Sequence, residues 1–160
     1  MIRTNLALAL TSVGATHEEQ TEGLSMLDEL VERTSKFETP NEWARVRLIL
    51  AHSLLTLRQE SPESVERAIA LLQSTLDVWT EQRSMSRWTQ VQFQLAVAFV
   101  ARAALDRSIT PEGAEELLRC ANNAARGYAA LGDQDGIRNS TELAERVRRV
   151  IADVAQGSPP

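Results

Sequence analysis

The sequence predicts an all-helical fold built from stacked antiparallel helix pairs. Three observations predict it: a long internal repeat, apolar residues at helical spacing, and a serine or threonine followed by a proline where helices would begin. The composition fits, because 43% of the 160 residues are hydrophobic, only 4% are aromatic, and the helix-favouring residues alanine and leucine are abundant. A chain of this length can bury about two thirds of its unfolded surface, so it needs neither a metal nor a disulfide to fold.

The first half of the repeat is a helical segment with a tryptophan. Residues Thr39–Ala51 match residues Ser84–Ala96 without a gap, at an offset of 45 residues. Two of the three tryptophans in the chain, Trp43 and Trp88, are related by this shift. The hydroxyl residues that begin the two segments, Thr39 and Ser84, are also 45 residues apart, and each could cap a helix there. Such a match indicates a copied structural unit.

A second apolar pattern follows each of these segments, at the spacing i, i+3, i+7 and i+10 that marks one face of a helix. Its copies are Ile69, Leu72, Leu76 and Trp79, and then Leu118, Ala121, Ala125 and Tyr128, at an offset of 49 residues. Leu24, Leu27 and Val31 form an earlier copy at the offset of 45, and residues 6–10 align with residues 50–54 at an offset of 44. Because the earliest copy has no counterpart of Trp43, we expect the chain to begin part-way through a repeat.

Helix boundaries follow from capping residues. Thr39-Pro40, Ser61-Pro62 and Thr110-Pro111 each place a capping hydroxyl before a proline at the first helical position. Glu42 can complete a capping box with Thr39. We expect no strands and seven helices, over residues 2–12, 17–36, 40–58, 62–82, 85–105, 111–131 and 136–154.

The last expected helix closes the stack. Gly132 stands where the preceding helix would end in a left-handed residue, and Asp133 or Asp135 can cap the new helix. We expect residues 1–155 to form one domain and residues 156–160 to form a flexible tail.

Each repeated unit resembles the tetratricopeptide repeat. Trp43 is followed seven residues later by Leu50-Ala51, and the second helix reads Glu66-Arg67-Ala68-Ile69-Ala70-Leu71-Leu72. The long period, with Trp88 four residues before Gln92, is similar to the repeats that precede caspase-like CHAT domains in many bacterial proteins. The resemblance covers nearly the whole chain. It implies a right-handed α-solenoid of about three antiparallel helix pairs with a C-terminal capping helix.

Three features depart from the tetratricopeptide pattern. Ala51 and Ala96 stand where the family has glycine, the period exceeds the family's usual length of about 34 residues, and no proline follows Trp79 to end the repeat. No protease segment accompanies the repeats. These departures concern the curvature of the stack and not its helical nature.

Charge and composition disfavour several classes of protein. The formal net charge of −5 disfavours nucleic-acid binding, which needs many cations to displace condensed counterions. No apolar run approaches the roughly 20 residues that span a bilayer, so no membrane association is expected. Cys120 is the only cysteine, which excludes an intrachain disulfide and fits a reducing, cytoplasmic location.

The sequence contains no pattern that is typical of an enzyme. His17 and His52 lie on different expected elements, and neither has a metal-ligating partner one helical turn away. Cys120 lies among apolar residues with nothing nearby to activate it, and no glycine-rich phosphate-binding turn is present. We therefore expect no catalytic residue, no metal site and no cofactor.

A candidate binding surface lies on the first helix of each pair. The expected helix over residues 85–105 has apolar residues on nearly every side. The tetratricopeptide resemblance implies that such first helices line a concave groove. The groove residues would then be Arg45, Leu48, His52 and Leu55 in one repeat, and Gln90, Phe93, Val97 and Val100 in the next. Alternatively, the last helix or a second copy of the chain covers these apolar residues.

These patterns predict a protein-protein interaction scaffold that binds a partner helix or peptide in the groove. Leu48, Phe93 and Val97 would be apolar anchors, and Arg45 and Gln90 would orient the partner. One alternative is that the truncated first repeat exposes an apolar end, which pairs with a second copy of the chain in a homo-oligomer or with preceding repeats of a longer parent. Another is a regulatory repeat segment of a larger effector, for example a protease, which rests on the resemblance alone.

Overall fold

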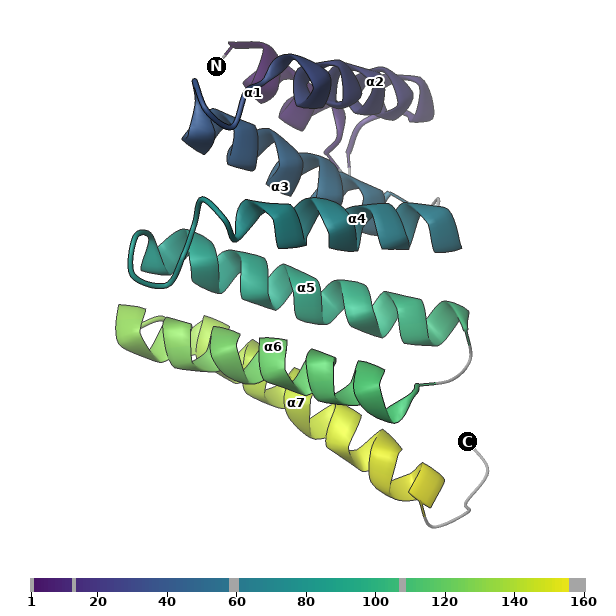
Figure 1. The fold of residues 1–160 in the computed structure, drawn as a ribbon. Coiled ribbons are helices and arrows are strands. Elements are labelled where there is room, and N and C mark those ends of the chain that lie inside the picture. Colours follow the sequence, from purple (N-terminus) through teal and green to yellow (C-terminus); the bar gives the residue numbers. More distant parts are fainter. Residues whose placement is uncertain (1, 13, 58–60, 107–108, 156–160) are drawn as a thin grey trace. The chain divides into compact units, whose positions relative to one another are not determined.

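A computed structural model describes residues 2–12, 14–57, 61–106 and 109–155 of the chain, with residues 153–155 described by their backbone alone. Within these ranges the regular secondary structure is entirely helical, which confirms the predicted all-α class (Figure 1). The helices are α1 (Ile2–Leu10), α2 (His17–Arg33), α3 (Pro40–Thr56), α4 (Pro62–Thr75), α5 (Met85–Leu105), α6 (Pro111–Leu131) and α7 (Gln134–Ala155). The tail predicted over residues 156–160 lies outside the described residues, as does residue 58, the predicted end of α3.

All helix ends except one lie within three residues of their expected positions. The exception is α4, which ends at Thr75, seven residues short of the expected end. The hydrogen bonding changes there to the i→i−3 pattern of a tighter turn: the N–H groups of Leu76 and Val78 donate to carbonyls three residues earlier, at 3.1 and 3.0 Å. The indole N–H of Trp79 then donates to Asn41 Oδ1 at 3.1 Å, which fixes the segment after α4 to the start of α3.

Most of the predicted helix caps are present. Ser61 Oγ accepts a hydrogen bond from the Ser64 N–H, and Thr110 Oγ1 accepts one from the Gly113 N–H, both at 3.1 Å. Gly132 adopts the predicted left-handed conformation at the end of α6, with a φ of 73°. These two hydroxyl caps begin α4 and α6, the second helices of the two later repeats.

The predicted capping box of Thr39 with Glu42 is wrong. Thr39 makes no side-chain cap, and its hydroxyl instead donates to the Ser35 carbonyl at 3.3 Å. Glu42 accepts a hydrogen bond from Thr4 Oγ1 at 2.7 Å, so its carboxylate joins α3 to α1. A complete capping box occurs at the start of α2.

The chain divides into two compact units, residues 1–79 and residues 80–160. The first unit contains α1 to α4, each packed against the next (Figure 1). Its main buried cluster draws on the first three helices and consists of Ala7, Leu27, Val31, Val46, Ile49 and Leu50. That residues 1–155 act as one domain stays a prediction.

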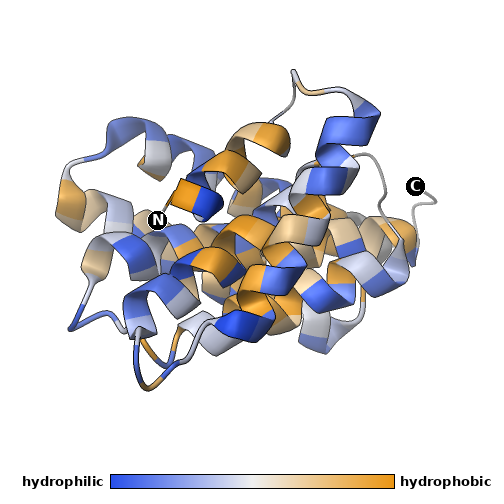
Figure 2. Cartoon of the chain, turned by 90° about the horizontal axis from the view of Figure 1, so that it is seen from above, coloured by the Kyte–Doolittle hydropathy of each residue, from blue (hydrophilic) through white to orange (hydrophobic). Residues whose placement is uncertain are grey.

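The second unit contains α5 packed on α6 and α6 packed on α7. The first two of these helices are in close contact at Gly127, where an added Cβ would lie 2.0 Å from Thr89 Oγ1. Gly136 of α7 similarly lies against the ring of Tyr128. Hydrophobic and hydrophilic residues occupy different sides of individual helices (Figure 2), as expected for amphipathic helices that bury one face.

The two units share one turn geometry at the offset found in the sequence. Before α3, the Glu38 N–H donates to Ser35 Oγ at 3.2 Å, and before α5, the Arg83 N–H donates to Thr80 Oγ1 at 3.2 Å. The helices α3 and α5 begin 45 residues apart, and α4 and α6 begin 49 residues apart. Each unit therefore contains one copy of the same helix pair.

Candidate interaction surface

The four groove residues predicted on α3 differ in exposure. Leu48 and Leu55 are buried, with 4% and 9% of their surface exposed. His52 is exposed, and Arg45 is half-buried. In this structure, only the two polar members of the set therefore present much of their side chains to solvent.

Arg45 is held by contacts with its neighbours. Its Nη2 donates to Asn5 Oδ1 of α1 at 2.7 Å, and its Nη1 lies 3.7 Å from Glu42 Oε2. Glu42 also accepts the hydrogen bond from Thr4 of α1. Arg45 and Glu42 together therefore join α3 to α1, and a partner that used the guanidinium would compete with these contacts.

The predicted residues on α5 form a continuous partly exposed face. Gln90, Phe93, Val97 and Val100 are all half-buried, and their spacing of three or four residues places them along one side of the helix. Gln90 Oε1 accepts a hydrogen bond from Arg87 Nη1 at 3.2 Å. We call the three apolar members, Phe93, Val97 and Val100, the α5 strip.

An aromatic contact supports one end of the α5 strip. The rings of Phe93 and Tyr128 meet edge to face, with centroids 6.2 Å apart and an interplanar angle of 73°. Tyr128 is half-buried between this contact and Gly136 of α7. Burial, and to a smaller extent the carboxylate of Asp133, raises the pKa of the Tyr128 hydroxyl, so the group is neutral at physiological pH.

The two predicted sets lie in different units. Arg45, Leu48, His52 and Leu55 belong to the first unit, and the α5 strip and Gln90 belong to the second. The two sets are therefore described separately, and a groove that joins them stays a prediction.

The repeated tryptophans have related surroundings. The guanidinium of Arg47 lies 3.9 Å from the ring centroid of Trp43, and that of Arg126 lies 5.3 Å from the ring centroid of Trp88. Both rings stand at the start of a first helix, after the shared turn. A cation therefore lies over each ring, from the tryptophan's own helix at Trp43 and from α6 at Trp88.

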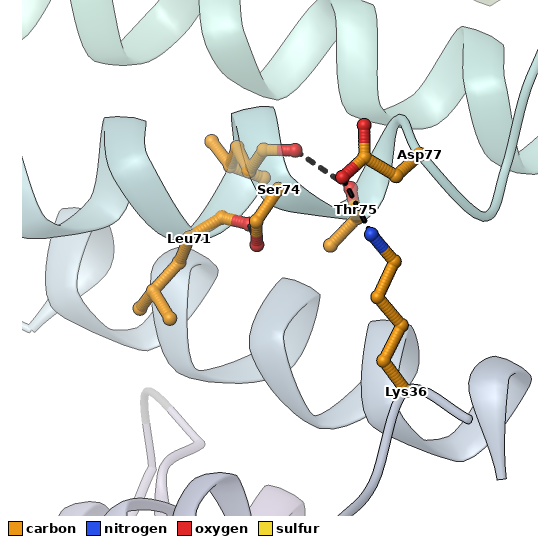
Figure 3. Close-up of polar contacts among 6 residues, drawn as sticks. Lys36, Leu71, Ser74, Thr75 and Asp77 are labelled. Carbon is orange, nitrogen blue, oxygen red and sulfur yellow. Dashed lines mark hydrogen bonds and ion pairs between the residues drawn. The ribbon is translucent and has the colours of Figure 1, made fainter. Parts of the chain in front are cut away.

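An ion pair closes the first complete helix pair, and sequence reasoning missed it. Lys36, in the turn before α3, extends towards Asp77, in the segment after α4 (Figure 3), and its Nζ lies 2.7 Å from Asp77 Oδ2. The same view shows Ser74 and Thr75, whose hydroxyls donate to carbonyls three residues earlier, at 2.7 Å each, where α4 ends. The pair thus links the beginning and the end of the repeat.

The second helix pair carries the same link with its charges reversed. Glu81 pairs with Arg126, and this hydrogen bond lowers the pKa of the Glu81 carboxyl. Residue 81 aligns with Lys36 at the offset of 45, and residue 126 aligns with Asp77 at the offset of 49. The signal was therefore present in the sequence: both aligned positions change the sign of their charge together.

A polar cavity of about 360 Å³ lies in the second unit, between the end of α5 and the start of α6. Its walls carry the carboxylates of Asp106, Glu112 and Glu116 and the guanidinium of Arg102, which lies 4.8 Å from the ring centroid of Phe99. No sequence motif marks the cavity, because its residues come from the end of one helix and the start of the next. Its mixed charges do not identify a ligand.

Cys120 has the properties of an inert thiol. The residue is fully buried, and burial raises its pKa to about 11, while Arg119 lowers the pKa and Glu116 raises it by smaller amounts. The thiol is therefore protonated at neutral pH and is a poor nucleophile. Across the part of the chain that the structure describes, no three His, Cys, Asp or Glu residues gather where they could hold a metal ion.

The helices within the described ranges also lack the combination of length and apolar character that a membrane span requires. Comparison with known proteins does not assign the chain to a family: no family model matches it, and neither does any curated protein or any solved structure.

Proposed function

We propose that the chain is a helical-repeat interaction module, similar to tetratricopeptide proteins, that binds an amphipathic helix or an extended peptide on α5. The observation that carries the proposal is the α5 strip, in which Phe93, Val97 and Val100 are apolar, aligned on one helix face and not fully covered. Apolar side chains in such a row are the usual anchors for a helical or extended peptide.

Polar groups beside the strip would orient the partner. Gln90 lies on the same face, and its amide can exchange the hydrogen bond from Arg87 for one to a partner backbone. Tyr128 meets Phe93 from α6 and adds aromatic surface at the same end. Because Leu48 is buried, the proposal places the apolar anchors on α5 and not on α3.

The proposal includes the finer features that the sequence predicts. The helix pairs would form a right-handed α-solenoid of about three pairs, with α7 as the capping helix. The module would act in the cytoplasm, without catalytic residues or a cofactor, and its partner would be a protein or a peptide.

Selection from a displayed peptide library tests the proposal. Random peptides of roughly 20 residues, long enough to lie along the strip as a helix, are selected on the intact chain. The selected peptides are then titrated by fluorescence anisotropy against the wild-type chain, Val97→Ala and Val150→Ala. Val150 is a matched control, because it is a valine of the same unit that is 47% exposed on α7.

We expect Val97→Ala to weaken binding by about tenfold, as loss of an anchor does, and Val150→Ala to leave it unchanged. Circular-dichroism melting of Val97→Ala and Phe93→Ala shows whether the variants keep their fold. Peptides that bind Val97→Ala as tightly as wild type, together with early melting of both variants, would mean that these side chains serve the core and not a partner.

Self-association is the alternative function, and one observation favours it. Ile2 and Leu6 of α1 are large apolar residues with 86% and 50% of their surface exposed. Sedimentation velocity over a range of concentrations decides between the two, since a chain that stays monomeric would reject self-association. A regulatory role within a larger effector system would require the chain to be found joined to, or bound by, that effector.

A further inference from the structure

One face of α1 is apolar and uncovered. Ile2, Leu6 and Ala9 are spaced by four and three residues, so they form a stripe along one side of the helix, and all three are exposed. The buried residues of α1, Thr4 and Ala7, lie on the opposite side, because an α-helix advances by about 100° per residue. We call Ile2, Leu6 and Ala9 the α1 stripe.

The internal repeat shows what the equivalent stripe does in the other first helices. At the offset of 44 residues, Ile2, Leu6 and Ala9 align with Val46, Leu50 and Ser53 of α3, and 45 residues later with Val91, Leu95 and Ala98 of α5. All six of these residues are buried, with 2% or less of their surface exposed. The alignment is sound, because Ala7 and its equivalents Ala51 and Ala96 are each completely buried.

The structure also shows what covers the stripe on α3. Val46 and Leu50 belong to one buried cluster with Leu27 and Val31 of α2, and Leu24 packs against that cluster. Ala7 of α1 belongs to the same cluster, so the cover includes the amphipathic helix α2 together with this alanine. The apolar residues of α2 are spaced by three and four positions, which is the spacing of a single helix face.

We propose that the α1 stripe is a docking site for an amphipathic helix of a partner protein, which packs on α1 as α2 packs on α3. The stripe corresponds to the one on α3 that packs against α2, but on α1 the structure leaves it bare. The partner helix would carry leucine or valine at the spacing of Leu24, Leu27 and Val31. This site is separate from the α5 strip.

A peptide from the chain itself is the probe. A fluorescein-labelled peptide of residues 15–36, which spans α2 and its capping box, is titrated against the intact chain by anisotropy. Leu6→Glu places a carboxylate in the stripe, and Leu8→Glu is the matched control. Leu8 is a leucine of the same helix with 43% of its surface exposed against 50% for Leu6, but its equivalent on α3, His52, is exposed.

We expect the peptide to bind the wild-type chain and the Leu8→Glu variant alike, within about twofold, and to bind Leu6→Glu at least roughly tenfold more weakly, because the contact would bury an unpaired carboxylate. The same peptide with glutamate in place of Leu27 should not bind. Circular dichroism should show both chain variants folded, and Leu6→Ala repeats the comparison with a milder change.

Three results would overturn the proposal. Equal binding to wild type and Leu6→Glu would mean that the peptide displaces α2 or adheres elsewhere. Equal loss in Leu6→Glu and Leu8→Glu would mean a non-specific apolar patch. Dimers of the wild-type chain that Leu6→Glu dissociates in sedimentation velocity would assign the stripe to a second copy of the chain.

Discussion

Single residues decide how closely the helices of the second unit approach. Gly127 of α6 is buried, and a Cβ at its position would lie 2.0 Å from Thr89 Oγ1 and 2.9 Å from Thr89 Cβ. Thr89 Oγ1 is buried without a hydrogen-bond partner among the described residues, so the contact between Thr89 and Gly127 is a van der Waals contact. Gly14, by contrast, has no atom within 4 Å of such a Cβ.

Gly127→Ala should therefore destabilise the chain by about 1–3 kcal/mol, because an added methyl group in a packed contact forces the helices apart. Gly14→Ala, the same substitution in open space, should change the free energy of unfolding by less than about 0.5 kcal/mol. Urea unfolding measures both. Thr89→Ala should recover part of the loss in the Gly127→Ala background. Equal effects of the two glycine substitutions would show that α5 and α6 are further apart than described.

Between elements, the two helix pairs are closed by ion pairs of opposite polarity. Lys36 and Asp77 close the first, and Glu81 and Arg126 close the second. In each pair, one partner lies in the turn before the first helix and the other lies near the end of the second. The geometry of the link is therefore copied, while the sign of each charge is not.

A double-mutant cycle tests whether polarity matters within one pair. Lys36→Glu and Asp77→Arg each break the ion pair, and together they give it the polarity of the second repeat. Because the side chains of Lys36 and Asp77 are 38% and 64% exposed, we expect a coupling of only about 0.2–1 kcal/mol, weaker at high salt. Strictly additive effects in urea unfolding would mean that the pair contributes nothing to stability.

Helix starts were predictable from the sequence because their signals are local. The hydroxyls of Ser61 and Thr110 bond within three residues of their own positions, so the sequence contains both partners of each cap. The early end of α4 was not predictable in this way, since it depends on Trp79 meeting Asn41, 38 residues away. The capping box at Thr39 fails for one local and one distant reason: the Thr39 hydroxyl donates to the Ser35 carbonyl, and the Glu42 carboxylate accepts from Thr4 of another helix.

The sequence predicts which residues of the candidate site share a helix face, but it does not predict how much of each side chain is exposed. The spacing placed Phe93, Val97 and Val100 on one face, and the structure keeps them there. Yet Leu48, which is equivalent to Phe93 at the offset of 45, is buried while Phe93 is half-buried. Equivalent positions share a helix face, but the neighbouring helices decide how much of that face is covered.

For the whole molecule, the central claim is that a copied helix pair gives each residue the surroundings of its equivalent, except where the described residues place no helix over that face. Leu6, Leu50 and Leu95 occupy one equivalent position in α1, α3 and α5. Leu50 and Leu95 are buried, at 0% and 2% exposure, and Leu6 is 50% exposed. The same side chain at the same repeat position should therefore have two different energetic roles.

The free energies of unfolding of Leu6→Ala, Leu50→Ala and Leu95→Ala test this claim most directly. We predict that Leu50→Ala and Leu95→Ala each cost about 2–5 kcal/mol, as cavities in a packed core do, and that Leu6→Ala costs less than about 1 kcal/mol. A loss of unfolding free energy in Leu6→Ala as large as in the other two variants would contradict the claim. So would losses in Leu50→Ala and Leu95→Ala that differ from each other as much as either differs from the loss in Leu6→Ala. In both cases the repeat would not govern the packing of this chain.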